Sequence, residues 1–137
     1  MRVVLDTNVI VSALLFGAYP ERVFLAGLRG EIQLLTSRAL LRELERVLTE
    51  KFKLGMKLVK DTLDVIETLA EIVETTSQLK VIEYPDDDNR VFECAVDGNA
   101  DFIVTGGTKH ILPLKAYKGI KILRPSEFAK LLPPTPP

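Results

Sequence analysis

Short apolar runs alternate with longer amphipathic segments along nearly the whole chain, and this alternation limits the possible folds more than any other feature. Each run is bounded by polar or turn-forming residues and is too short for a typical helix, so it predicts a strand. The expected strands lie at residues 2–5, 31–35, 119–123 and within 101–107, with a candidate edge strand at 79–84. Their unbroken apolar character is typical of parallel strands that are buried on both faces.

The amphipathic segments between these runs predict helices. Pro20 suits the first turn of one helix, and Thr36 with Ser37 suits the cap of another. The expected helices cover residues 9–16, 20–28, 38–50, 57–74, 88–98 and 124–132. Strands that alternate with helices in this way predict an α/β fold, with a central parallel sheet covered by helices on both faces.

The chain has 137 residues without an internal repeat or an evident linker, which predicts a single domain. We assign this domain to residues 1–132. The proline-rich tail, residues 133–137, is expected to be disordered, because proline cannot continue a helix or donate to a strand ladder.

Composition narrows the range of functions. The formal net charge is −1, so no overall basic field attracts nucleic acid, and any such binding must be local. Cys94 is the only cysteine, which excludes an intrachain disulfide and favours a reducing compartment. The apolar run at residues 9–16 is too short for a membrane helix and follows no basic segment of a signal peptide. We therefore expect a cytoplasmic protein with no membrane association.

Polar residues follow three of the expected strands. Ligand sites in parallel α/β sheets lie beyond the carboxyl ends of the strands. Asp6 directly follows the first expected strand, Ser37 lies just beyond the second, and Thr105 follows the apolar run Phe-Ile-Val. Asp101 precedes that last run and is expected at the opposite edge. The sequence thus predicts a site at the carboxyl edge.

Two further acidic residues reach this edge from helices, which run antiparallel to the strands in such a fold. Asp88 begins one expected helix, and Glu43 lies in the second turn of another. Carboxylates that converge with Asp6 repel one another unless protons or a cation compensate. A cluster of carboxylates suits a hard divalent cation that prefers oxygen ligands, which favours Mg²⁺ or Mn²⁺. A structural zinc site is excluded, because His110 and Cys94 are the only residues of their types.

Structural roles compete with this interpretation. Asp6 and Asp88 both suit the start of a helix, and Ser37 suits a cap better than a nucleophile because no histidine is adjacent. Glu43 and Glu45 both fall on the borders of the apolar stripe, so periodicity does not choose between them.

Four segments, taken in order, carry a resemblance to a known family. They are VVLDTNVIVSALL, LLTSRALLRELERVL, PDDDNRVFECAVDGNADFIVTGGTKHIL and KILRPSEFAKLL. The chain resembles PIN-domain proteins over nearly its whole length, and among these it is most similar to the VapC-like toxins of toxin–antitoxin pairs. The resemblance implies a three-layer α/β/α sandwich and metal-dependent cleavage of RNA to products with a 5′-phosphate and a 3′-hydroxyl.

The resemblance also implies roles for single residues. Asp6 corresponds to the first acidic ligand, in the motif Asp-Thr-Asn, and Asn8 orients that carboxylate or its loop. The second ligand is the glutamate six residues after the helix-opening serine, which is Glu43. The third opens the later helix, which favours Asp88 over its two acidic predecessors. Thr105 supplies a hydroxyl that lines the site.

One position departs from the family pattern. Gly107 stands where many relatives carry Asp or Asn, so one polar group is missing, and a firmly held second metal ion is in doubt. We expect an Mg²⁺- or Mn²⁺-dependent endoribonuclease, with RNA as substrate, an antitoxin as partner and a homodimeric assembly. Arg38, Arg42, Arg90 and Lys109 are candidate phosphate contacts. The alternatives are a PIN module that binds RNA or an antitoxin without cleavage and, more distantly, an aspartate-dependent phosphotransfer protein.

Overall fold

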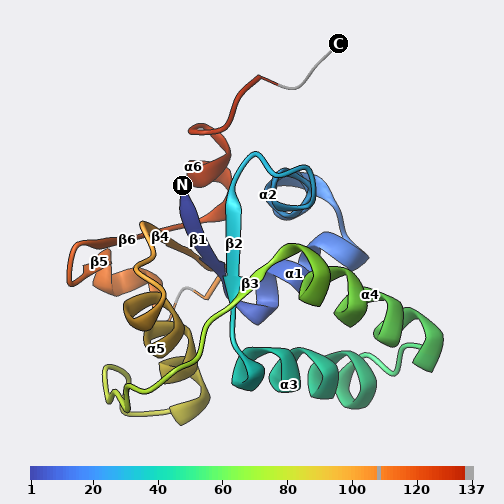
Figure 1. The fold of residues 1–137 in the computed structure, drawn as a ribbon, viewed down its shortest axis with the longest axis horizontal. Coiled ribbons are helices and arrows are strands. Elements are labelled where there is room, and N and C mark those ends of the chain that lie inside the picture. The colour runs from blue at the N-terminus through green and yellow to red at the C-terminus, as the bar shows by residue number, and fades with distance from the viewer. Residues whose placement is uncertain (108, 135–137) are drawn as a thin grey trace.

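Among residues 1–107 and 109–134, which the computed structural model describes, six strands form one sheet in the order β3-β2-β1-β4-β6-β5 (Figure 1). Their bounds are β1 (Arg2–Leu5), β2 (Gln33–Thr36), β3 (Glu71–Ile72), β4 (Phe102–Val104), β5 (Ala116–Tyr117) and β6 (Ile120–Leu123). All neighbouring strands pair in parallel except β5, which pairs antiparallel with β6. The predicted parallel sheet is therefore confirmed, with one short antiparallel strand added at its edge.

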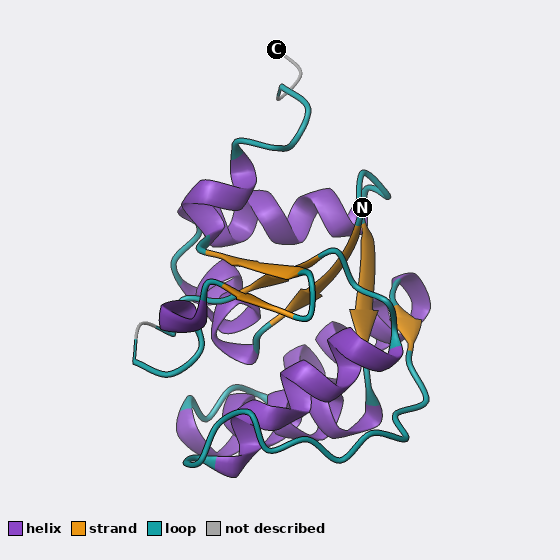
Figure 2. Ribbon diagram, turned by 90° about the vertical axis from the view of Figure 1, so that its left-hand side faces the viewer, coloured by secondary structure: helices purple, strands orange, loops and turns teal. Residues whose placement is uncertain are grey.

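The helices are α1 (Thr7–Leu15), α2 (Ala18–Leu28), α3 (Arg38–Arg46), α4 (Met56–Leu69), α5 (Asn89–Asp97) and α6 (Pro125–Ala129). A π-helical segment, Val47–Lys51, continues α3, and short 3-10 turns occur at Asp86–Asp88 and Leu112–Leu114. Figure 2 shows the strands in the interior with helices around them.

Side chains on both faces of the sheet are buried, as the unbroken apolar runs predict. In β1, Val3 and Leu5 enter one hydrophobic core, whereas Val4 enters the other. The first core is completed by residues of α1, α2, α3, α4 and α6, and the second mainly by α5. The predicted three-layer α/β/α arrangement is confirmed.

The helix expected at residues 57–74 ends earlier than its periodicity indicates. It stops at Leu69, and Glu71–Ile72 instead pairs with β2 as an edge strand. In the sequence, Val73 continues the helical spacing of apolar residues. In the structure, its side chain instead packs in the core on the α5 side of the sheet. The pairing is supported by an ion pair of 2.7 Å between Arg2 and Glu71, which no local pattern predicts.

The edge strand expected at residues 79–84 does not form. The backbone of Ile82 pairs with a side chain instead of a strand: its N–H donates to Asn89 Oδ1 at 2.7 Å, and its carbonyl accepts from Asn89 Nδ2 at 2.8 Å. Val73 still extends the pairing of β3 with β2, because its N–H donates to the carbonyl of Thr36 at 2.7 Å. The segment 74–85, which we call the strap, lies along α5 without joining the sheet.

The last helix, expected at residues 124–132, is confined to Pro125–Ala129. The tail expected to be disordered lies mostly outside the described residues, which end at residue 134. Taken singly, none of the helices in the described part of the chain is long and apolar enough to cross a membrane; α1 and α2 meet those criteria only as a pair bent by 105°.

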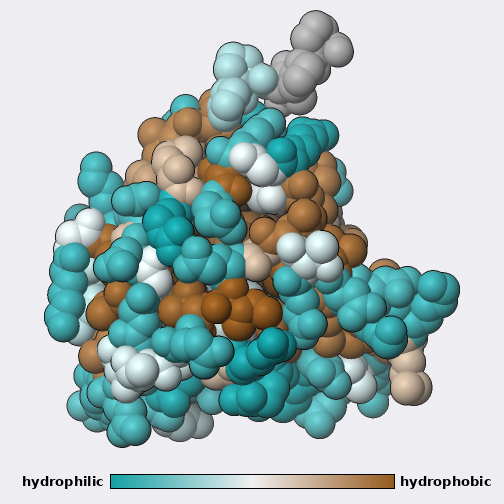
Figure 3. Space-filling model, viewed as in Figure 1, coloured by the Kyte–Doolittle hydropathy of each residue, from teal (hydrophilic) through white to brown (hydrophobic). Residues whose placement is uncertain are grey.

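Some large apolar side chains stay at the surface. Figure 3 shows apolar residues (brown) interspersed with hydrophilic ones (teal) on the face of Figure 1. Leu58, Val65 and Leu69 of α4 are exposed, and so is Phe16, which follows α1 and is 77% exposed. By contrast, Cys94 is fully buried, and burial raises the pKa of its thiol to about 12, which makes it unreactive.

Candidate functional site

Asp6 lies where β1 ends and α1 begins, at the carboxyl edge of the sheet. Its backbone N–H donates to the carbonyl of Val104 at 2.9 Å, which extends the pairing of β1 with β4. The side chain is 8% exposed and caps α1. Oδ1 accepts from the backbone N–H of Thr7 at 2.8 Å, and Oδ2 accepts from the hydroxyl of Thr105 at 2.7 Å. Asp6 is therefore both a helix cap and a carboxylate fixed by the end of β4.

Asn8 ties the loop after β1 to the loop after β4. Its Nδ2 lies 3.4 Å from Asp6 Oδ2, and its Oδ1 accepts from the backbone N–H of Gly106 at 3.1 Å. The hydroxyl of Thr105 also accepts from the N–H of Gly107 at 3.0 Å. These contacts place Asn8 and Thr105 against Asp6, with the Thr105 hydroxyl fully buried behind the carboxylate. The supporting roles that the resemblance implies for them remain predictions.

Glu43 and Glu45 differ clearly in their surroundings. Glu43 is half-buried, and its Oε2 accepts from the hydroxyl of Thr7 at 2.9 Å, whereas Glu45 is exposed and lies away from Asp6. Ser37 is buried and accepts from the backbone N–H of Leu40 at 3.2 Å, so it acts as the cap of α3. Thr7, which sequence reasoning passed over, links α1 to Glu43; its place inside the Asp-Thr-Asn motif was the available signal.

Three consecutive aspartates, Asp86, Asp87 and Asp88, precede α5, and we call them the acidic triplet. In the described part of the chain, two of them form ion pairs and one does not. Asp86 pairs with Arg90 at 3.2 Å, and Asp87 pairs with Arg46 at 3.1 Å. Asp88 occupies the N-cap position of α5, but its side chain makes no capping bond, and it has no ion pair within residues 1–107 and 109–134. The carboxylate of Asp88 is therefore available to the cleft.

Side chains of α5 hold the strap through a row of hydrogen bonds at four-residue spacing. Besides Asn89, Glu93 accepts from the N–H of Leu79 at 2.9 Å, and Asp97 accepts from the N–H of Thr76 at 2.7 Å. We call Asn89, Glu93 and Asp97 the polar row. Since the strap leads into Pro85 and the acidic triplet, the polar row fixes the approach of the chain to Asp88.

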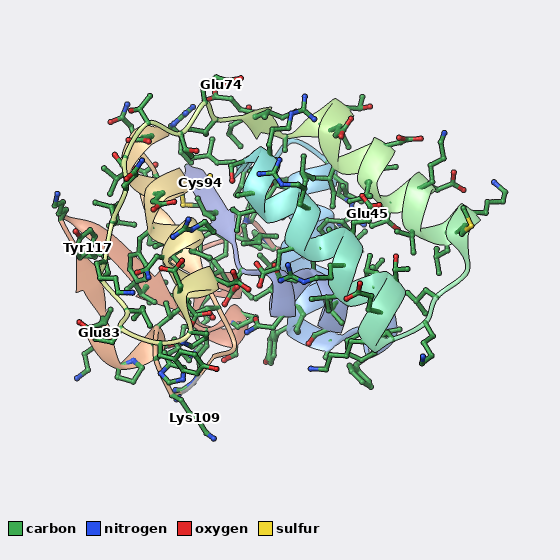
Figure 4. All side chains as sticks on the ribbon, turned by 90° about the horizontal axis from the view of Figure 1, so that it is seen from below. Glu45, Glu74, Glu83, Cys94, Lys109 and Tyr117 are labelled. Atoms are coloured by element: carbon green, nitrogen blue, oxygen red, sulfur yellow. The ribbon has the colours of Figure 1, made fainter. Side chains whose placement is uncertain are left out.

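Asp6, Glu43 and Asp88 line one cleft of about 260 Å³. Figure 4 views the molecule from the side toward which β1 and β2 point, and there α3 and α5 flank the end of β1. A second hollow, of about 390 Å³, shares Asp6 and Asp88. Its other lining residues include Gly107 and Lys109, whose side chain extends outward in Figure 4.

The three carboxylates share raised pKa values but differ in their basic neighbours. Burial raises the pKa of each above its ordinary value. The charge of Asp88 further raises the pKa of Asp6, and that of Asp6 raises the pKa of Glu43. Hydrogen bonds from Thr105 and Thr7 oppose these effects. The charge of His110 opposes the rise of the pKa at Asp88, and that of Arg46 opposes it at Glu43. A cation in the cleft would relieve the mutual repulsion, so the donor set suits a hard divalent ion.

The carboxylates of Asp6, Glu43 and Asp88 do not meet at a single point. Among the residues that the structure describes, no three Asp, Glu, His or Cys side chains are close enough to ligate a single metal ion. The structure brings Asp6, Glu43 and Asp88 to one cleft, and ligation of one ion requires them to approach further.

Two of the candidate phosphate contacts are already engaged. Arg38 pairs with Glu67, and Arg90 pairs with Asp86 and Glu93. Several residues that line the cleft were not anticipated, among them Phe16, Lys51 and Phe52. Their distance in sequence from every acidic motif explains why no pattern connected them to the site.

Comparison with known proteins places this architecture in a family. The family model described as PIN domain matches residues 2–109. The crystal structure of VapBC2 from Rickettsia felis bound to a DNA fragment from their promoter is similar in fold, with a TM-score of 0.60 and 21% sequence identity over 90% of this chain and 98% of that one. No curated protein matches in a comparison of sequences. The chain belongs to the PIN domain family.

Proposed function

We propose that this protein is a metal-dependent endoribonuclease in which Asp6, Glu43 and Asp88 hold Mg²⁺ or Mn²⁺. The observation that carries the proposal is the environment of Asp6, whose carboxylate is buried and has Asp88 as its charged neighbour, with no basic residue in that role among those the structure describes. A buried carboxylate beside another carboxylate is costly without compensation. Membership of the PIN domain family, which consists largely of nucleases, supports the same conclusion.

The chain's own residues prepare the site for this chemistry. Thr7 N–H and the Thr105 hydroxyl donate to Asp6 and favour its ionised form, and the Thr7 hydroxyl does the same for Glu43. Asn8 and Gly106 fix the loop beside Asp6. A bound divalent ion would supply an activated water and stabilise charge on the scissile phosphate.

We further propose that the protein is the toxin of a toxin–antitoxin pair and acts in the cytoplasm. The similarity of its fold to the crystal structure of VapBC2 supports a cognate antitoxin as partner. Co-purification of the chain with the product of an adjacent small gene, and loss of RNA cleavage in that complex, would test this assignment.

A homodimer is part of the proposal. Leu58, Val65 and Leu69 lie along one side of α4 and are 41–49% exposed, whereas Val59 and Ile66 of the same helix are buried in the core. Burial of Leu58, Val65 and Leu69 between two copies would remove apolar surface from water. Light scattering at micromolar concentration should give twice the mass of the chain, and a monomeric mass would refute the pairing.

A second candidate function is a PIN module that binds RNA or an antitoxin without cleaving RNA. Two observations favour it. Gly107 supplies no side-chain oxygen beside Thr105, and no three acidic side chains in the described part of the chain are spaced to ligate one ion.

RNA cleavage with Mg²⁺, Mn²⁺ or EDTA separates the two candidates. The nuclease should cut mixed RNAs with either metal and not with EDTA. Glu43→Gln should abolish cleavage, whereas Glu45→Gln, a matched change one helical face away, should leave it intact because Glu45 is exposed and outside the cleft. Equal activity of both variants would remove Glu43 from the site.

A further inference from the structure

One wall of the carboxylate cleft is aromatic. Phe16 and Phe52 come from different elements, the end of α1 and the end of the π-helical segment, and both line the cleft that contains Asp6, Glu43 and Asp88. Phe52 packs partly against the core, whereas the ring of Phe16 is 77% exposed. A single exposed phenyl ring is ordinary, but here it borders a cleft of buried carboxylates.

The π-helical segment brings a cation to the same wall. A π turn takes more residues than an α turn, so it rotates the residues that follow relative to a continuing α-helix. Here the N–H of Phe52 donates to the carbonyl of Val47 at 3.1 Å, and Lys51 and Phe52 line the cleft. The Nζ of Lys51 lies 5.5 Å from the centre of the Phe52 ring and has no ion pair with another described residue.

We propose that Phe16, Phe52 and Lys51 form a subsite for one unpaired nucleobase and its phosphate, next to the bond that is cut. The inference rests on the proposed ribonuclease function and deepens it, because it names the residues that would contact a base beside the cut bond. A base stacks on a phenyl face whatever its identity, so this subsite selects for strandedness and not for sequence. A base in a duplex is already stacked and paired and cannot enter the cleft.

The size and charge of the cleft fit this occupant. Its volume of about 260 Å³ is below the roughly 300–1,000 Å³ that is usual for larger ligands, which suits a single base. The carboxylates repel phosphate, so a strand needs a cation near its point of entry, and Lys51 supplies one. The hollow on the other side of Asp6 and Asp88, lined by Lys109, leaves room for the strand to continue.

The affinity for RNA, measured in EDTA, tests the subsite, because removal of the metal prevents cleavage of the probe. The probe is a short, unstructured, fluorescently labelled oligoribonucleotide, alone or annealed to its complement, and fluorescence anisotropy gives the affinity. Wild type should bind the single strand more tightly. Phe16→Leu keeps an apolar side chain but removes the ring, and it should weaken single-strand binding by roughly 5- to 150-fold. Phe16→Tyr should bind as wild type does.

Three further arms sharpen the test. Tyr19→Leu is the matched control, because Tyr19 is also exposed but lines a different hollow, and it should have no effect. Lys51→Gln should reduce the slope of log affinity against log salt by about 0.7, the value for one phosphate contact on a single strand. An abasic nucleotide at one position should weaken binding to wild type and have no further effect in Phe16→Leu.

The outcomes separate this inference from the proposed function. If wild type cuts no RNA with either metal but the abasic position and Phe16 remain coupled, the nuclease function fails and the subsite stands. If wild type cuts RNA and Phe16→Leu binds single strands as wild type does, the subsite is wrong although the nuclease function stands. Equal affinity for single and double strands, or no binding at all, would also overturn it.

Discussion

Asp6 and Asp88 face the same cleft, but the fold holds them in different ways. Asp6 is fixed by the sheet, through its own backbone bond to Val104 and through donors to both carboxylate oxygens. Asp88 has a fixed backbone at the start of α5, yet its side chain has no capping bond. One carboxylate belongs to the rigid core, and the other depends on how the strap delivers the chain to α5.

This difference shows where the site is able to adjust. Interactions buried in a sheet open only with global unfolding, whereas a segment held by side-chain hydrogen bonds opens locally at lower cost. The closer approach that metal ligation requires is therefore expected from Asp88 and Glu43, with Asp6 as the fixed point. The following predictions test this contrast, from the largest expected effect to the smallest.

The largest effect is expected from Asp6→Asn. Loss of the central carboxylate should reduce RNA cleavage by more than about 100-fold, since even the outer partners of metal ligands are worth roughly 10- to 100-fold. The fold should persist, because asparagine caps helices as well as aspartate does. Cleavage assays with circular dichroism check both points. A cooperative unfolding transition several degrees lower than that of wild type would mean that Asp6 is mainly structural.

Asn89→Ala should damage the Asp88 side of the site. Asn89 is fully buried and satisfies both backbone groups of Ile82, so its loss should lower the free energy of unfolding by about 2–4 kcal/mol. Cleavage should fall by about 10-fold or more, and amide exchange in the strap should accelerate.

The opposite end of the polar row provides the control. Asp97→Asn removes the charge that Thr76 and Ser77 donate to, but at the strap's far end from Asp88. It should accelerate exchange near Thr76 with little change in cleavage. Equal losses of cleavage in Asn89→Ala and Asp97→Asn would show that the strap acts as a single unit and that Asn89 has no special role.

Gly107→Asp tests whether the missing side chain limits metal binding. The backbone of Gly107 lies outside the left-handed region, and an added Cβ would meet Thr105 Oγ1 at 3.3 Å, which is tight but tolerable after a small shift. The variant should bind a second metal ion more tightly and cleave severalfold faster at low metal. Calorimetric titration beside cleavage assays checks this. Two tight sites in wild type would show that the side chain at this position is not needed.

The smallest effect concerns pH and stability without metal. Because the folded protein raises the pKa of Asp6, Glu43 and Asp88, it binds more protons than the unfolded chain, and these groups lower its stability as pH rises through their raised values. Asp6→Asn should therefore melt about 2–5 °C higher than wild type at neutral pH, with the gain lost below the ordinary aspartate pKa. A gain that is independent of pH would argue against charge repulsion as its cause.

Much of this architecture follows from local patterns. The apolar runs predicted β1, β2, β4 and β6. Asp6 lies at the carboxyl edge of the sheet as expected, because a residue that directly follows a strand must lie where that strand ends. Glu43 was not separable from Glu45 by periodicity, since the difference depends on a hydroxyl that belongs to α1. Only the family resemblance favoured Glu43 before the structure placed it in the cleft.

The remaining features depend on contacts that leave no periodic signal. The pairing of β3 relies on Arg2 and Glu71, which are far apart in sequence, and two residues are too few to show a strand pattern. Asn89 satisfies a backbone segment seven positions earlier, and this converts an expected strand into the strap. Phe52 reaches the cleft because α3 continues as a π turn, which the apolar stripe of that segment does not reveal.

The two outer strands of the sheet carry a final consequence. In the part of the chain that the structure describes, β3 and β5 close the sheet at its two sides, and each is only two residues long. A binding partner that adds a strand needs a longer run of free backbone N–H and carbonyl groups than two residues offer. Edge strands this short also disfavour the pairing of sheet edges between molecules that leads to aggregation. The proposed antitoxin and the proposed second copy of the chain are therefore expected to bind through side chains at the surface and not by adding a strand to the sheet.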